Sequence, residues 1–302
     1  YGTACPQELV DFETVLKKDL AKAGNEKRFA KDKKFWDDQL DALGEPLYSD
    51  IQGPSVLEEA RKRHGNPKLR ASDIEMNELF VAVKDYHLEP YATQNLMDFC
   101  MNHQLSMTNL LLLGIRTYLS KVNNGQEDIT IQNFISRRST HDEWTSGGSR
   151  TIMFPCGTVI SPETDFLSAA YEIQNMQNRI YMHSNYDPAL IVDEMRKRYH
   201  TPEHTSYESC YLTYQPMPVK VENEMLGTIR QHAKWFANGA ATKKMYLTVS
   251  HTEDGGMNFS YHYQTAHLEE HDMELLYYYM MRILFKGIAE PDMSIGEIME
   301  QV

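Results

Sequence analysis

The chain has 302 residues, 41% of them hydrophobic and 24% charged, a composition typical of a soluble globular protein with a sizeable core. Its formal net charge of −13 repels polyanions on average and disfavours nucleic-acid binding. The longest apolar run, Leu110–Leu113, is far shorter than the roughly 20 residues that a membrane-spanning helix needs. The first residues carry no signal-peptide pattern, so we expect a cytoplasmic protein that binds neither membrane nor nucleic acid.

The first 77 residues favour helices and a connector. Apolar residues at helical spacing predict helices at 7–24 and 28–43, separated by Gly24-Asn25. The stretch from 49 to 77 is polar and contains glycine and proline breakers. It predicts a connector with one short helix at 57–62.

From residue 78 onward, segments of strand and helix length are interspersed. The expected strands are 79–83, 128–135, 151–160, 207–214 and a hairpin of 244–251 with 257–263. The expected helices are 90–102, 110–122, 166–182, 188–198, 270–288 and 292–298. Residues 137–150 are expected to form a polar loop, and residues 216–242 to be irregular. This pattern indicates an α/β fold in which helices cover one mixed β-sheet.

The cysteines do not point to a metal or disulfide site. Cys5, Cys100, Cys156 and Cys210 are widely spaced and form no C-x-x-C pair. We therefore expect thiols in a reducing compartment and no metal ligand set.

Other common motifs of chemistry are also absent from the sequence. It contains neither a glycine-rich phosphate loop nor G-x-S-x-G or H-E-x-x-H. His267 and His271 have helical i, i+4 spacing but no third ligand, so we interpret them as surface histidines near a helix start. Composition and spacing alone thus lead to an α/β domain without a visible catalytic set.

The order of several short segments is more informative. Lys33–Leu40 has an aromatic pair followed by leucine, Asn124–Ile129 reads N-G-Q-E-D-I, and Phe134–Arg138 reads F-I-S-R-R. Thr151–Phe154 reads T-I-M-F, and Tyr181–Pro188 reads Y-M-H-S-N-Y-D-P. Further segments in the same order are Leu9–Phe12, Leu105–Leu112, Tyr211–Gln215, Tyr261–Tyr263 and Ile288–Asp292. In this order the segments resemble those of condensation domains of nonribosomal peptide synthetases, over nearly the whole chain.

This resemblance implies a fold and a reaction. The fold would be a chloramphenicol acetyltransferase-like lobe, with connecting helices and linker in 1–77 and the C-terminal lobe in 78–302. The family joins acyl or aminoacyl thioesters by forming an amide bond. The substrates are carried on phosphopantetheine arms of carrier proteins, so the chain itself would bind no cofactor.

The resemblance also implies which residues matter. The family's catalytic histidine lies in H-H-x-x-x-D-G, and no H-H dipeptide occurs here, so we expect the chain to begin partway through the domain. Arg138 or the adjacent Arg137 matches the family arginine that pairs with the motif aspartate. Ser136 and the strand with Phe154 and Cys156 would face the substrate tunnel.

Some positions depart from the family pattern. Phe154-Pro155-Cys156-Gly157 replaces the usual Phe-Val-Asn-Thr, and no Phe-Glu follows Pro188. His183 would lie at the surface or the tunnel wall and is not expected to be catalytic. These departures are typical of a divergent member with altered or lost activity.

Three functions remain open from the sequence. The chain is the C-terminal part of an amide-forming condensation domain and inactive alone, or a non-catalytic module that docks a carrier protein or partner. Otherwise it belongs to another acyltransferase that uses coenzyme A or a different thioester. Expected partners are carrier-protein domains and an N-terminal condensation lobe, and exposed tunnel surface would promote self-association.

Overall fold

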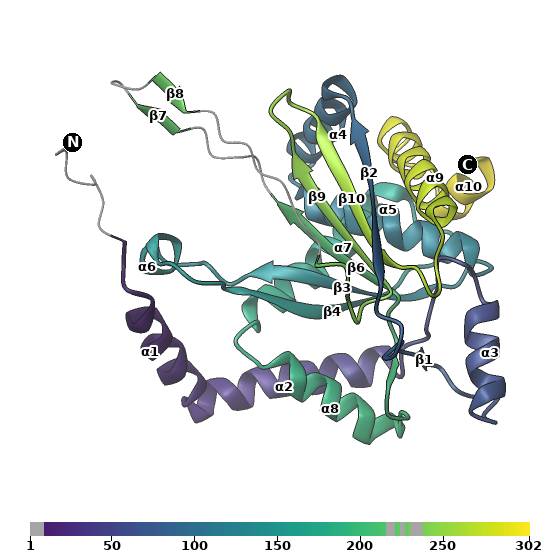
Figure 1. The fold of residues 1–302 in the computed structure, drawn as a ribbon, viewed down its shortest axis with the longest axis horizontal. Helices are drawn as coiled ribbons and strands as arrows, with labels where there is room; N and C mark the ends of the chain where they lie inside the picture. Colours follow the sequence, from purple (N-terminus) through teal and green to yellow (C-terminus); the bar gives the residue numbers. More distant parts are fainter. Residues whose placement is uncertain (1–8, 216–220, 224–226, 230–237) are drawn as a thin grey trace. The chain divides into compact units, whose positions relative to one another are not determined.

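The computed structural model describes residues 9–215, 221–223, 227–229 and 238–302 (Figure 1). The chain forms two compact units. The first comprises residues 1–45, 134–154 and 178–201, and the second comprises residues 46–133, 155–177 and 202–302. No helix among the described residues is long and apolar enough to cross a membrane.

The second unit contains most of a six-stranded mixed sheet, with strand order β2-β10-β9-β6-β3-β4 (Figure 1). The six strands are β2 Val81–Leu88, β3 Asp128–Ser136, β4 Thr151–Val159, β6 Cys210–Gln215, β9 Met245–His251 and β10 Met257–Gln264. Strands β2, β10 and β9 pair antiparallel, whereas β9, β6 and β3 pair in parallel. Two small antiparallel pairs complete the strands: β1 Ser72–Asp73 with β5 Thr205–Ser206, and β7 Val221–Asn223 with β8 Gly227–Ile229.

The helices of the second unit are α3 Ser55–Arg63, α4 Pro90–Asn102, α5 Met107–Val122, α9 Glu270–Ala289, α10 Ile295–Gln301 and the larger part of α7 Phe166–Met182. Of these, α4, α9 and α10 pack against α5. Ser106 caps α5, and every residue from Asn109 to Ser120 is buried, as expected for a central helix that is covered on all sides. Gly114 lets α9 approach closely, because a Cβ there would lie 3.0 Å from Leu284. The core of this unit therefore lies between α5, α9 and the sheet.

The first unit consists of helices and of the ends of two strands. Its helices are α1 Phe12–Ala23, α2 Glu26–Leu43, α6 His141–Thr145 and α8 Pro188–Tyr199. Asp11 and Asn25 accept backbone hydrogen bonds at the starts of α1 and α2. Trp36 stacks on Phe154 with ring centroids 5.6 Å apart, which packs α2 against the start of β4.

Most of the fold predicted from the sequence is confirmed. A mixed sheet with helices is present, α4 has the expected bounds, and β9 and β10 form the expected hairpin. The expected division at residue 77 concerns lobes of a larger fold and stays a prediction.

Several local predictions differ from the structure, and four of the differences are informative. Strand β2 extends to Leu88 because it pairs along its whole length with β10. Strand β6 begins only at Cys210, because Ser206 forms a turn in which its hydroxyl accepts from the Glu208 backbone N–H at 3.1 Å. The loop after β3 contains the short helix α6. Residues 216–242 were expected to be irregular, and most of them lie outside the described residues. Two described stretches, 221–223 and 227–229, pair as β7 and β8.

Candidate functional site

The segment after β3 carries the two predicted arginines, Arg137 and Arg138. The hydrogen bonds of the Arg138 side chain all go to backbone atoms of this same segment. Its guanidinium donates to the backbone carbonyl of Glu143, to that of Ser146 at 3.1 Å and to that of Gly148 at 2.7 Å. Among the described residues, no carboxylate lies within ion-pair distance of Arg138. Arg138 therefore holds the shape of the 139–148 loop.

Arg137 points to a different neighbour. Its Nη2 lies 3.4 Å from Oδ2 of Asp19 on α1, a long and weak contact. Arg150, just before β4, makes the stronger bond: its two terminal nitrogens lie 2.6 and 3.2 Å from the Asp19 carboxylate oxygens. Within the described part of the chain, the contact with Asp19 is the one side-chain hydrogen bond of Arg137, which leaves most of its five N–H donors unused.

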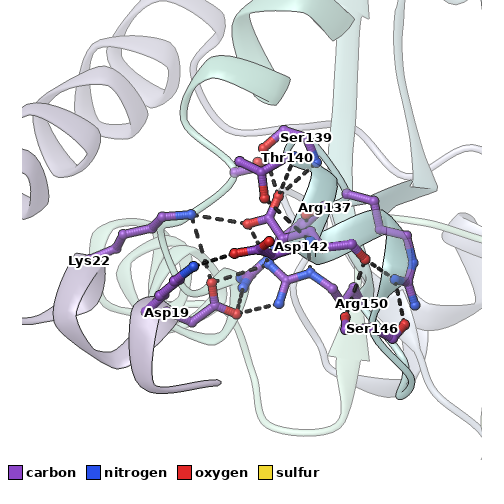
Figure 2. Close-up of polar contacts among 12 residues, drawn as sticks. Asp19, Lys22, Arg137, Ser139, Thr140, Asp142, Ser146 and Arg150 are labelled. Atoms are coloured by element: carbon purple, nitrogen blue, oxygen red, sulfur yellow. Dashed lines mark hydrogen bonds and ion pairs between the residues drawn. The ribbon is translucent and has the colours of Figure 1, made fainter. Parts of the chain in front are cut away.

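Glu143 is the second anion of this cluster (Figure 2). Its carboxylate accepts from the Ser139 backbone N–H and hydroxyl at 2.7 and 2.9 Å and from the Thr140 N–H at 2.9 Å. Lys22 of α1 and Arg150 add ion pairs of 3.0 and 3.1 Å. Figure 2 shows Asp19 and Lys22 of α1 pointing toward the Arg137–Arg150 segment.

Ionisation of both carboxylates is favoured inside the cluster. Burial opposes the charge of Glu143, but the hydrogen bonds from Ser139, Lys22 and Thr140 outweigh it and hold the pKa far below its usual range. Burial likewise opposes the charge of Asp19, and Arg150 lowers its pKa nonetheless. The cluster is thus a network of ion pairs and hydrogen bonds that fixes the loop between β3 and β4 against α1.

Of the predicted tunnel residues, one is exposed and two are buried. Ser136 ends β3 and is exposed, whereas Phe154 and Cys156 are 0% and 3% exposed. Gln177 of α7 donates from Nε2 to the Cys156 sulfur at 2.8 Å and accepts from Asn133 at 3.1 Å. Their tunnel-lining role stays a prediction.

The Cys156 thiol is poorly suited to nucleophilic chemistry. Burial raises its pKa to about 12, although Gln177 and the Asn133 backbone partly oppose this shift. A thiol with this pKa is almost wholly protonated near neutral pH, and the thiolate is the reactive form.

His183 forms an Asp–His pair within the first unit. Its Nδ1 lies 2.7 Å from Oδ1 of Asp32 on α2, and the two side chains are 12% and 5% exposed. The ring also stacks on Phe35, with centroids 4.1 Å apart. When the ring is neutral, this contact with the carboxylate favours the tautomer with hydrogen on Nδ1, in which Nε2 is an acceptor.

No metal site is apparent in the described part of the chain. No group of three or more His, Cys, Asp or Glu side chains gathers there in a ligand arrangement. His267 pairs with Glu75 at 3.3 Å and His271 with Glu274 at 3.3 Å, so each belongs to a separate surface contact.

A family model described as the condensation domain matches residues 7–300 of the chain. The chain belongs to the condensation domain family. A curated relative is a plipastatin synthase component from Bacillus subtilis (strain 168), which is 20% identical over 211 residues. That match covers 70% of this chain but only 8% of the relative.

Solved structures show the same fold at low sequence identity. The first condensation domain of the calcium-dependent antibiotic synthetase, in complex with a substrate analogue, superposes with a TM-score of 0.72 at 14% identity. VibH, a nonribosomal peptide synthetase condensation enzyme, gives 0.67 at 11% identity. Each match covers 97% of this chain, but the chain spans only 58% and 62% of these two structures.

The sequence of this condensation domain pointed to Arg137 and Arg138 as site residues, but it did not point to Asp19, Glu143 and Arg150. A local pattern could have predicted the position of Glu143, because Thr140-x-x-Glu143 is the pattern of a helix capping box. The ion pair of Asp19 with Arg150 joins residues 131 positions apart, and no local pattern announces it.

Proposed function

We propose that this chain is the C-terminal part of a nonribosomal peptide synthetase condensation domain. The proposal rests above all on the family match across residues 7–300. It is further supported by the order of the family segments and by the absence of H-H-x-x-x-D-G from the 302 residues. In the proposed reaction, the amine of an acceptor attacks the carbonyl of a donor thioester, an amide bond forms, and the donor thiol leaves on its carrier arm.

The role of this chain in that reaction is positioning. Holding two tethered substrates in the reacting geometry lowers the activation barrier of their reaction. Fixed dipoles lower it further by stabilising the charge that develops in the transition state. The substrates arrive on phosphopantetheine arms of carrier proteins, so no cofactor of the chain's own is needed. The motif histidine, which would act as base or positioning group, belongs to the N-terminal lobe of the family fold.

Arg137 is the residue that we assign to the pairing with the motif aspartate. Arg138 already donates to three carbonyl oxygens of its own loop, whereas Arg137 makes one long contact to Asp19. An incoming carboxylate would therefore find free donors on Arg137 without breaking the loop. Arg150 keeps Asp19 in place, so Arg137 is not needed there. Ser136 lies beside it at the exposed end of β3 and is the remaining candidate for contact with substrate.

An assay of amide formation tests the proposal. The chain is mixed with carrier proteins loaded with a panel of donor and acceptor aminoacyl groups, and carrier-bound products are measured by mass spectrometry. The chain alone is expected to form no amide product. The condensation domain of the calcium-dependent antibiotic synthetase, with its own carrier-bound substrates, is the positive control. Turnover by the chain alone would overturn the proposal.

A second candidate is a docking module without catalysis. One structural neighbour is the X-domain in complex with OxyB from teicoplanin biosynthesis, at a TM-score of 0.58 and 13% identity over 81% of this chain. The buried Cys156, in the position of a family asparagine, also favours a divergent role. Binding of a loaded carrier protein that persists in the Arg137→Met variant, with no amide formation when a motif-bearing lobe is added, would favour this candidate.

A further inference from the structure

The second unit contains a cavity that shares no residue with the arginine cluster. Its volume is about 610 Å³, within the size range of small-molecule sites. It is lined by α3, by the β1 and β5 segments and by the amino ends of β6 and β9. Tyr211 of its wall pairs in parallel with Gln132 of β3, so the cavity borders the parallel part of the sheet.

The lining of this cavity carries more negative than positive charge. Its ionisable residues are four carboxylates, two permanent cations and two histidines: Glu59, Asp73, Glu75, Glu208, Arg63, Lys244, His64 and His267. The excess of carboxylates makes the cavity attractive to cations and repulsive to anions.

Both permanent cations of the lining are already neutralised by the protein. Lys244 lies 2.7 Å from Asp50, whose side chain is completely buried behind it. Arg63 lies 2.6 Å from Asp73, which His64 also contacts at 2.6 Å. A phosphate or carboxylate ligand would have to displace one of these pairs, so the cavity does not suit an anion.

Among the residues that the structure describes, two carboxylates of the lining have no cationic partner. Glu208 accepts from the Ser206 hydroxyl at 2.6 Å and from the Gln132 amide at 3.0 Å, and both donors are neutral. Burial raises the pKa of Glu208, although these two hydrogen bonds oppose the shift. Glu59 lies on the exposed side of α3, and within the described residues no cation is within ion-pair distance of it. Glu208 is half-buried and its two hydrogen-bond partners are neutral, so it would gain from a cation that enters the cavity.

We propose that this cavity binds a small organic cation whose ammonium group pairs with Glu208, with Glu59 adding further attraction. The wall also contains the Tyr211 ring, where an entering ammonium group would replace the present contact with the Lys243 ammonium, 4.9 Å from the ring centroid. This site uses other residues than the proposed condensation chemistry and does not depend on it.

Calorimetric titration of the whole chain with spermidine and with agmatine tests this site, with citrate as the anionic comparison. We expect saturable binding of the amines at one site and none of citrate. Glu208→Gln and Glu59→Gln keep the side-chain volume but remove the charge, so each should weaken amine binding about tenfold or more. Glu58→Gln, on the same helix but outside the lining, is the matched control and should leave the affinity unchanged.

A steric variant keeps the test decisive if Glu208→Gln does not fold. Ala266 is an exposed lining residue, and Ala266→Trp should fill the cavity and abolish binding without disturbing the core. Absence of saturable amine binding by the unmodified chain would overturn the proposal. An equal loss in Glu58→Gln and Glu59→Gln would do so as well, because it would reveal only general attraction to an acidic surface.

Discussion

Arg150 and Asp19 form a bidentate ion pair, with nitrogen–oxygen distances of 2.6 and 3.2 Å, that ties the segment before β4 to helix α1. The Arg150 side chain is only 4% exposed and also contacts Glu143, whose side chain is 5% exposed. Arg150 thus compensates the negative charge of two carboxylates that are largely shielded from water. Its removal would leave both charges undercompensated.

We therefore expect Arg150→Met to destabilise the chain by about 3–5 kcal/mol, the cost of breaking a buried ion pair from one side. The measurement is the free energy of unfolding in urea. Arg179→Met is the matched control, because Arg179 is exposed and lies outside the cluster, so its change should stay within about 0.5 kcal/mol. Equal stability of the two variants would contradict the role given to Arg150.

The cluster also predicts how stability depends on pH. The folded-state pKa of Glu143 and of Asp19 lies below their ordinary values of 4.5 and 3.8. The unfolded chain therefore binds more protons as the pH falls below about 5, and the stabilisation from these groups is lost progressively toward lower pH. Above that range their contribution is fully present.

Unfolding in urea across the acid range checks this pH dependence. We expect Glu143→Gln to be less stable than the unmodified chain at neutral pH and to lose stability less steeply on acidification. The same steepness in both proteins would mean that Glu143 does not carry the effect.

The buried thiols predict selective chemical protection. Burial raises the pKa of Cys100, Cys156 and Cys210 to about 12 in each case, so little thiolate is present near neutral pH. We expect iodoacetamide to leave these three cysteines unmodified in the folded chain and to modify them in denaturant, as peptide mass spectrometry will show. Rapid modification of Cys156 under native conditions would contradict its placement beside Gln177.

The His183–Asp32 pair predicts a tautomer. At a pH where the ring is neutral, the hydrogen bond of 2.7 Å should place its hydrogen on Nδ1, and Asp32→Asn should shift the population toward the Nε2–H form. Ring nitrogen chemical shifts from long-range ¹H–¹⁵N correlation spectra distinguish the two forms. A predominant Nε2–H form in the unmodified chain would show that Asp32 does not orient the ring.

Much of the fold could be predicted from local patterns in the sequence. Helix α4 has its expected bounds because Pro90 fits the first helical turn and the helix ends near Asn102. The glycine-containing turn before Met257 likewise made the hairpin of β9 and β10 predictable. Helix α6 was missed because its five residues are too few for hydrophobic periodicity.

The candidate site was less predictable, for a physical reason. Family segments pointed to Arg137 and Arg138 but not to what each guanidinium contacts. The contacts of Arg137 and Arg150 depend on Asp19, which tertiary packing brings to the arginine loop from a position without a sequence signature. Glu143 lies in the loop itself, and its capping box is a local pattern that says nothing of its ion pair with Arg150. Burial of Cys156 under Gln177 is also a tertiary effect, since the strand pattern alone does not say which of its faces is covered.

Complementation tests the central claim most directly. The chain is mixed with a separately produced lobe that carries the H-H-x-x-x-D-G motif, and amide products on loaded carrier proteins are measured by mass spectrometry. We predict no product from either part alone, product from the mixture, and a strong loss with Arg137→Met but little loss with the exposed Arg179→Met. Amide formation by the 302-residue chain alone, or a mixture in which Arg137→Met is as active as the unmodified chain, would contradict the account.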